Sequence, residues 1–256
     1  MRRFVACVLV GLALSCGLSS EALAQKAGGA AAFTVEPHRP GKIDVYVLSF
    51  GLWGPQSVFE SEAKGAARIL EGQFGSKGRT IVRVNTKARS EATPASLLAA
   101  SQAVGRALDP DEDVIMLVLT SHGAPQGLGL VSRREAHIVT PDDVRYLLGE
   151  TKARHRVVIV SACYSGIFAN ALADERTLVI TAAAEDKPSF GCRDGATWTY
   201  FGDAFFNKAL RNERQLDVAF KKAHDLVTKR EEREGFDPSH PQIAGGAPVL
   251  ERLKAR

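Results

Sequence analysis

Hydrophobic and polar positions along the chain follow two alternating patterns. Short runs of apolar, often β-branched residues predict buried strands, and the segments between them show the three- and four-residue spacing of helices. The predicted strands are Ile43–Ser49, Arg79–Val84, Asp113–Thr120, Arg156–Ser161 and Thr177–Ala182. The predicted helices are Ser57–Phe74, Thr93–Leu108, Thr140–Leu148, Ser165–Ala173, Thr199–Arg211 and Gln215–Arg233.

Continuous apolar strands that alternate with helices are typical of a mostly parallel sheet covered by helices on both faces. The pattern therefore predicts one α/β domain over residues 42–256. A Gly-rich, hairpin-like piece at Gln126–Ser132 interrupts it, and a Pro-containing tail follows from Asp237. Residues 25–41 are rich in Ala and Gly and predict a flexible lead-in.

The first 24 residues have the layout of a secretory signal peptide. A basic start at Arg2 and Arg3 precedes a short apolar run, Phe4–Leu14, and the segment ends in Ala22-Leu23-Ala24. The run is about half of the roughly 20 residues that a membrane-spanning helix needs. Lipid attachment at Cys16 is the alternative, although the residues before it fit a lipoprotein site poorly. We expect cleavage near Ala24 and a periplasmic or secreted protein without stable membrane insertion.

Removing this segment changes the charge and the cysteine content. The formal charge of +4 falls to +3, because two arginines and one glutamate leave. So mild a surplus, without a basic tract, predicts no nucleic-acid partner. Only Cys163 and Cys192 remain, and they either form a single bridge or include a thiol kept for its reactivity.

Two predicted strands end in residues that carry chemistry. Ser121-His122-Gly123-Ala124 follows the third strand, and Ala162-Cys163-Tyr164-Ser165-Gly166 follows the fourth. If these strands are parallel neighbours, an imidazole and a thiol meet at one edge of the sheet, where an imidazole can activate a thiol. The N–H groups of Gly123 and Cys163 could form an oxyanion hole. The alternative is that Cys163 is a small buried hydrophobe.

Other motifs give no competing chemistry. The remaining histidines show no metal-ligand spacing, so no metal or other cofactor is predicted. Gly127-Leu128-Gly129 lacks the third glycine of a dinucleotide fingerprint, and no G-x-S-x-G serine motif occurs.

The two strand-end motifs, LVLTSHGA and VVIVSACYSG, resemble those of the legumain-type cysteine peptidases. The resemblance runs from about Ile43 to Asn212 and implies a caspase-like three-layer sandwich. It implies that His122 is the catalytic histidine and Cys163 the nucleophile, with Gly123 and Cys163 supplying the oxyanion N–H groups. In this fold the histidine acts mainly by protonating the leaving amine and activating water.

A later stretch, Lys187–Cys192 followed by Thr199–Asp203, resembles the segment that walls the legumain S1 pocket. Ser189 and Asp203 match that pocket, but Tyr164 stands where legumains carry an acid, and no arginine follows the first strand. The resemblance therefore implies Asn or a basic residue at P1. It also places Cys192 near the pocket, as a bridge to Cys163 or as a buried free thiol.

We therefore expect an exported cysteine endopeptidase that acts on peptides or proteins. The same acyl-enzyme could serve a transpeptidase, and a catalytically silent binding module with this fold is the alternative from another class. The sequence does not predict an oligomeric state.

Overall fold

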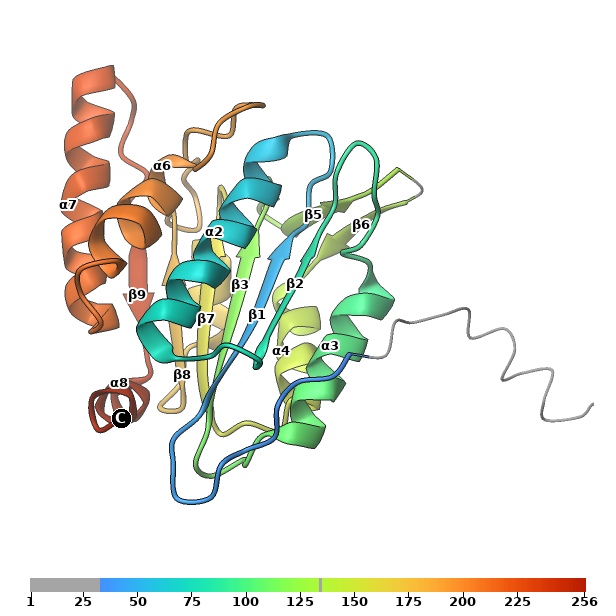
Figure 1. Cartoon of the computed structure of the whole chain (residues 1–256). Helices are drawn as coiled ribbons and strands as arrows, with labels where there is room; N and C mark the ends of the chain where they lie inside the picture. The colour runs from blue at the N-terminus through green and yellow to red at the C-terminus, as the bar shows by residue number, and fades with distance from the viewer. Residues whose placement is uncertain (1–32, 134) are drawn as a thin grey trace, which may run out of the picture. The chain divides into compact units, whose positions relative to one another are not determined.

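The computed structural model describes residues 33–133 and 135–256, which build a central sheet between two layers of helices (Figure 1). The predicted signal peptide and residues 25–32 lie outside this part of the chain. The sheet has the order β2-β1-β3-β7-β8-β9. Its strands are β1 (Val45–Gly51), β2 (Thr80–Val84), β3 (Val114–Thr120), β7 (His155–Ser161), β8 (Thr177–Thr181) and β9 (Gln242–Ala244). All are parallel except β9, which runs antiparallel to β8.

Alternate residues of the strands face two separate hydrophobic cores. In β1, Tyr46 and Leu48 belong to one core, and Val45 and Val47 to the other. The first core is closed by α3 (Pro94–Ala107), α4 (Pro141–Glu150) and α5 (Gly166–Leu172). The second is closed by α2 (Ser57–Phe74), α6 (Tyr200–Gly202), η1 (Asp203–Leu210), α7 (Leu216–Glu234) and α8 (Ala247–Lys254). Burial on both faces explains the continuous apolar runs, and the predicted α/β sandwich is confirmed.

Three parts of the chain differ from the sequence-based prediction. The tail from Asp237 contains β9 and α8, which are too short to stand out as a pattern. The Gly-rich piece belongs to a three-stranded antiparallel sheet of β4 (Gly123–Ala124), β5 (Gly127–Val131) and β6 (Ala136–Val139). The predicted helix Thr199–Arg211 is one turn of α-helix followed by the π-helix η1.

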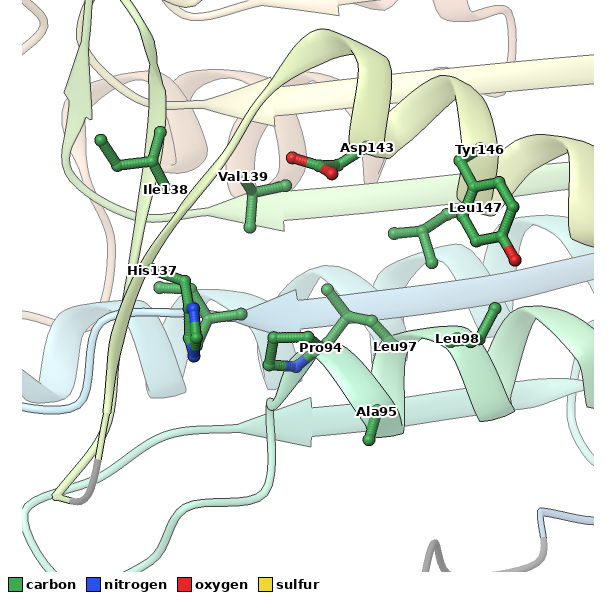
Figure 2. A pocket seen from close by; sticks show the side chains of 11 residues that line it. Pro94, Ala95, Leu97, Leu98, His137, Ile138, Val139, Asp143, Tyr146 and Leu147 are labelled. Carbon is green, nitrogen blue, oxygen red and sulfur yellow. The ribbon is translucent and has the colours of Figure 1, made fainter. Parts of the chain in front are cut away.

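The small sheet packs beside α3 and α4 and leaves a groove between them (Figure 2). This cavity has a volume of about 430 Å³ and is lined mostly by apolar side chains. None of the helices in the described part of the chain is long and apolar enough to cross a membrane.

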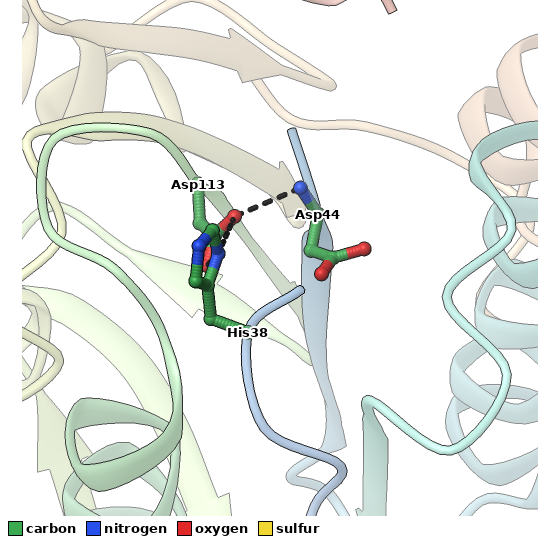
Figure 3. Close-up of side chains that lie close together, drawn as sticks. All are labelled: His38, Asp44 and Asp113. Atoms are coloured by element: carbon green, nitrogen blue, oxygen red, sulfur yellow. Dashed lines mark hydrogen bonds and ion pairs between the residues drawn. The ribbon is translucent and has the colours of Figure 1, made fainter. Parts of the chain in front are cut away.

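A buried polar network holds the amino ends of β1 and β3 together (Figure 3). The Asp113 carboxylate accepts hydrogen bonds from the N–H groups of Asp44 and Asp109, both at 2.8 Å, and contacts His38 Nδ1 at 3.1 Å. The Glu36 N–H donates to the Gly78 carbonyl at 2.9 Å. These contacts of Glu36 and His38 differ from the flexible lead-in that composition predicts for residues 25–41.

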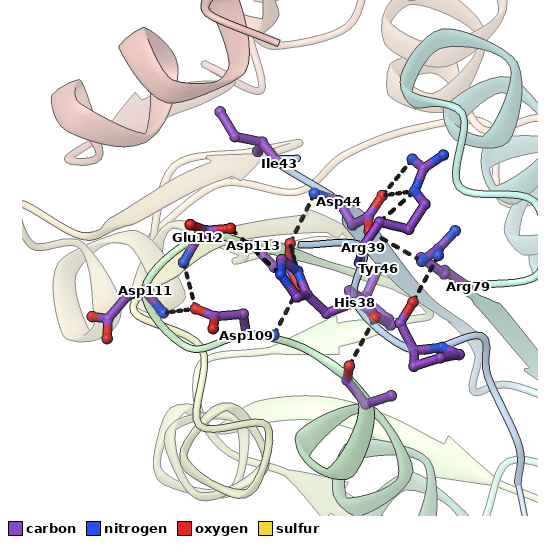
Figure 4. A network of polar contacts seen from close by, with 12 residues as sticks. His38, Arg39, Ile43, Asp44, Tyr46, Arg79, Asp109, Asp111, Glu112 and Asp113 are labelled. Atoms are coloured by element: carbon purple, nitrogen blue, oxygen red, sulfur yellow. Dashed lines mark hydrogen bonds and ion pairs between the residues drawn. The ribbon is translucent and has the colours of Figure 1, made fainter. Parts of the chain in front are cut away.

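His38, Asp44 and Asp113 lie close enough together for their side chains to hold a metal ion. The Asp44 carboxylate, however, already accepts hydrogen bonds from Arg39 and lies 3.6 Å from Arg79 Nε (Figure 4). Two guanidinium groups beside this carboxylate would repel a cation, so the network is interpreted as structural.

Substitution of Asp113 tests whether this network is structural. In Asp113→Ala the buried Asp44 N–H loses its acceptor, as does the Asp109 N–H, so we expect the free energy of unfolding to fall by about 2–4 kcal/mol. Asp113→Asn keeps an acceptor oxygen and should lose less. Urea denaturation measures both. Asp111→Ala, at a side chain that is 64% exposed, is the control and should change stability by less than about 0.5 kcal/mol. An equally small loss in Asp113→Ala would contradict the assignment.

Candidate active site

The ends of β3 and β7 bring His122 and Cys163 to one edge of the sheet. The two strands pair in parallel with Thr120 opposite Ser161, and each candidate residue comes two positions later. The loops that follow touch each other: a Cβ added at Gly123 would lie 1.9 Å from the Cys163 carbonyl oxygen. Only glycine fits position 123, because the neighbouring atom belongs to the backbone.

His122 is held on three sides. Its ring meets Trp53 and Phe59 edge to face, with ring centroids 4.8 and 5.0 Å apart. Its Nε2 atom is hydrogen-bonded to the Gln56 side-chain oxygen. Burial lowers the pKa of His122 below its ordinary value, so the ring is neutral near pH 7.

The partners of Gln56 fix the tautomer of that neutral ring. The Gln56 side-chain N–H donates to the Cys192 carbonyl at 2.9 Å, so the amide oxygen is the end that faces His122. An oxygen can only accept, and His122 Nε2 must therefore carry the hydrogen. The Nδ1 atom is left as the nitrogen that can accept a proton. Sequence reasoning missed Gln56, because nothing in Trp53-Gly54-Pro55-Gln56 marks it as a partner of a residue 66 positions away.

The Cys163 sulfur faces Ser189. The Ser189 N–H lies 3.2 Å from Sγ, its hydroxyl 3.8 Å, and the thiol points to the Ser189 carbonyl at 3.4 Å. Donors directed at the sulfur stabilise negative charge on it. Of the predicted pocket residues, Ser189 is the one that contacts the thiol.

Tyr164 forms the sharp turn between β7 and α5. Its φ of 55° lies in the left-handed region, which costs a non-glycine residue roughly 1–2 kcal/mol. The turn is held by the Tyr164 N–H, which donates to the Lys187 carbonyl at 2.8 Å. The same bond fixes the start of the segment that carries Ser189.

Cys192 is a second thiol on that segment. Burial, followed by the nearby Cys163, raises the pKa of Cys192 to about 12. It is therefore protonated and unreactive near neutral pH. Both cysteines are free thiols in this structure, as the second of the two predicted alternatives for Cys192 requires.

A buried carboxylate that sequence reasoning missed lies behind the site. Glu62 of α2 is fully buried and accepts hydrogen bonds from the Thr120 hydroxyl and the Thr199 N–H, both at 2.8 Å. Burial raises its pKa, and hydrogen bonds from Ser161, Thr199 and Thr120 oppose that rise. The sequence did contain one sign that Glu62 is buried. It falls on the apolar stripe of α2, between Phe59 and Ala66.

Asp203 lies at the start of η1, and its carboxylate already has hydrogen-bond and ion-pair partners within the protein. It accepts a hydrogen bond from Asn207 at 2.8 Å, pairs with Lys208 at 2.7 Å and lies 4.0 Å from Arg230. Burial raises the pKa of Asp203, but Lys208 and Asn207 outweigh it, so the pKa ends below its usual value. The role of Asp203 in substrate binding stays a prediction.

Together these residues give a thiol with the Ser189 N–H and hydroxyl directed at its sulfur and, after the neighbouring strand, a neutral imidazole in one fixed tautomer. Such a site can carry out nucleophilic chemistry on a carbonyl group with proton transfer. The backbones of Gly123 and Cys163 lie against each other at this edge of the sheet.

Comparisons with known proteins agree with the fold described above. Caspase-1 from Spodoptera frugiperda has a similar fold, with a TM-score of 0.57 and 14% sequence identity, covering 84% of this chain and 90% of the caspase. Sequence comparison with curated proteins gives no match. The model of the peptidase C13 family matches residues 95–246, more than half of the chain, including His122 and Cys163. The chain therefore belongs to the peptidase C13 family and is a cysteine-type endopeptidase.

Proposed function

We propose that Cys163 is the nucleophile of this peptidase and His122 its proton-transfer group. The observation that carries the proposal is the pairing of Thr120 with Ser161, which puts both residues on one sheet edge. The Cys163 sulfur bonds to the scissile carbonyl carbon and the C–N bond breaks. His122 Nδ1 takes up the thiol proton and passes it to the leaving amine. Water then hydrolyses the thioester and restores the thiol.

The Gly123 and Cys163 N–H groups are proposed to bind the oxyanion of the tetrahedral intermediate. The close approach of the two loops supports this, since it brings the backbone of Gly123 next to that of the residue that carries the attacking sulfur. Each such donor contributes about 3–4 kcal/mol of transition-state stabilisation in known enzymes.

For the P1 side chain we propose a pocket formed by Ser189, Tyr164 and Asp203. Lys208 and Arg230 already balance the charge of Asp203. A neutral amide therefore suits this pocket better than a basic group, which favours Asn of the two P1 classes that the resemblance implies.

Labelling with a peptide acyloxymethyl ketone, which reacts with active-site thiols, tests the nucleophile. We expect the wild type to be labelled at pH 7.5 and Cys163→Ala to lose labelling completely. Cys192→Ala is the matched control and should keep it, because the pKa of about 12 leaves that thiol protonated. Equal labelling of Cys163→Ala would refute the central proposal, and mass spectrometry of the adduct identifies the modified residue.

Export is proposed on the signal-peptide pattern of residues 1–24. The same labelled protein provides the check: it should be recovered outside the cytoplasm with Gln25 as its first residue. Intact residues 1–24 on the labelled protein would count against export.

Gln56 is proposed to orient His122, and the pH profile of kcat/KM tests this. Gln56→Leu removes the acceptor for Nε2–H, so we expect kcat/KM to fall by about 10- to 100-fold, or roughly 1.4–2.7 kcal/mol. In the wild type the lowered His122 pKa means that activity is lost only as the pH falls below the ordinary value of 6.5. In Gln56→Glu a carboxylate would stabilise the imidazolium, so the loss should begin at higher pH.

Gln73→Leu, near the other end of α2, is the control for this pair: the half-buried Gln73 donates to the Arg211 carbonyl, and its loss should leave the profile unchanged. An unshifted acidic limb in Gln56→Glu would remove Gln56 from the site.

A P1-randomised peptide library, read by mass spectrometry, tests the pocket. We expect cleavage after Asn to dominate in the wild type. Lys208→Met removes one partner of Asp203, so cleavage after Lys and Arg should rise several-fold relative to Asn, since the freed carboxylate attracts cations. Lys222→Met, which frees Glu213 instead, is the control. An unchanged P1 profile in both Lys208→Met and Asp203→Ala would exclude Asp203 from the pocket.

A further inference from the structure

The groove beside β6 is apolar and open to solvent (Figure 2). Three elements line it with side chains that share an apolar character: Leu97 and Leu98 of α3, Tyr146 and Leu147 of α4, and Ile138 and Val139 of β6. Among the residues that the structure describes, the two most exposed large hydrophobic side chains are Tyr146 at 58% and Ile138 at 56%. Both lie at this groove.

One border of the groove is also a free strand edge. In the small sheet β6 is an outer strand, and β5 is its only strand partner among the described residues. Its sequence, Ala136-His137-Ile138-Val139, contains no lysine or proline, the residues that usually protect such edges. Unpaired backbone groups therefore lie next to apolar side chains.

We propose that β6 and this groove bind an extended, apolar segment of the protein substrate, away from the scissile bond. An extended peptide can add a strand to β6 through its backbone and place alternate side chains in the groove. A helix or a small apolar molecule would fill the groove but leave the strand edge unpaired. The identification of the partner as substrate rests on the proposed peptidase function.

The size of the surface favours a peptide over a second copy of the chain. Four residues of β6 give a strand of roughly 13 Å, enough for one short peptide. A stable dimer buries about 800 Å² on each partner, and a single groove with a four-residue edge offers much less.

The groove is connected to the catalytic edge by the same small sheet. Ile138 pairs with Gly129, and the Gly129 N–H donates to the His122 carbonyl at 3.0 Å. Strands in a sheet lie about 4.8 Å apart, so a strand added to β6 would lie roughly 14 Å from β4, where Gly123 stands. A linker of about five residues or more could span that distance. The bound segment and the scissile bond can therefore belong to one polypeptide.

Two fluorogenic peptides test the proposal. Both carry the same cleavage sequence, and the longer one adds an eight-residue Gly-Ser linker and the segment Thr-Val-Thr-Ile-Thr. On the wild type we expect the longer peptide to have a KM about tenfold lower with the same kcat, because only binding differs. Ile138→Asp should abolish the difference while leaving turnover of the short peptide unchanged. Leu226→Asp, at an exposed aliphatic side chain away from the groove, is the matched control and should preserve it.

The outcomes separate this proposal from the peptidase proposal. Turnover of the short peptide reports on the proposed catalytic site, and the difference between the peptides reports on the groove. Fluorescence anisotropy of labelled Thr-Val-Thr-Ile-Thr on Cys163→Ala measures binding without any cleavage, and Ile138→Asp in that background should weaken it at least tenfold. N-methylation of alternate amides should do the same if the backbone pairs with β6. Equal KM values for the two peptides, or a wild type that sediments as a dimer and dissociates in Ile138→Asp, would overturn the proposal.

Discussion

The parallel pairing of β3 with β7 is the constraint on which the site depends. Seven residue pairs, from Val114 opposite His155 to Thr120 opposite Ser161, fix the register. A shift by one residue would turn one strand's side chains to the other face, and would exchange which of them enter each core. Because both strands are buried on both faces, the two cores hold the register and thereby keep His122 and Cys163 at the same edge of the sheet. The same apolar residues that stabilise the fold therefore set the relative positions of these two residues.

Glu62 links the end of β3 to the start of α6 through hydrogen bonds. Its carboxylate takes hydrogen bonds from Thr120 at the end of β3 and from the Thr199 N–H at the start of α6. A buried carboxylate without a cationic partner is costly unless hydrogen bonds satisfy it. The backbone at Gly202 passes so close to this carboxylate that a Cβ there would lie 1.9 Å from Glu62 Oε2. The carboxylate thus specifies one arrangement of three elements that are far apart in sequence.

The sequence allowed the strands to be predicted, and His122 and Cys163 to be singled out as a candidate pair, because both depend on local patterns. Apolar runs mark buried strands, and SHGA and ACYSG stand directly at their ends. Gln56 and Glu62 could not be found in this way, because their roles depend on partners brought near by folding. The same holds for β9, whose three residues form a strand only because β8 offers a free edge. The sequence left the role of Cys192 open between a bridge and a free thiol. Its burial, which raises the pKa of the thiol, is known only from the structure.

The start of α2 is bonded both to His122 and to the segment that carries Ser189, so the positions of the two are linked. Gln56 holds His122, and the next residue, Ser57, donates its N–H and hydroxyl to Asp194 at 2.9 and 3.0 Å. Asp194 belongs to the segment that carries Ser189, and Lys87 pairs with it at 2.6 Å from the loop after β2. The Lys87 and Ser57 hydrogen bonds keep the pKa of Asp194 below its usual range, so it stays ionised and bound at neutral pH. A movement of the segment that carries Ser189 and Asp194 would pull on Ser57 and would therefore also move Gln56 and the His122 ring bonded to it. The residue bonded to His122 and the segment that carries Ser189 thus share one anchor, the first turn of a helix that is itself buried against the sheet.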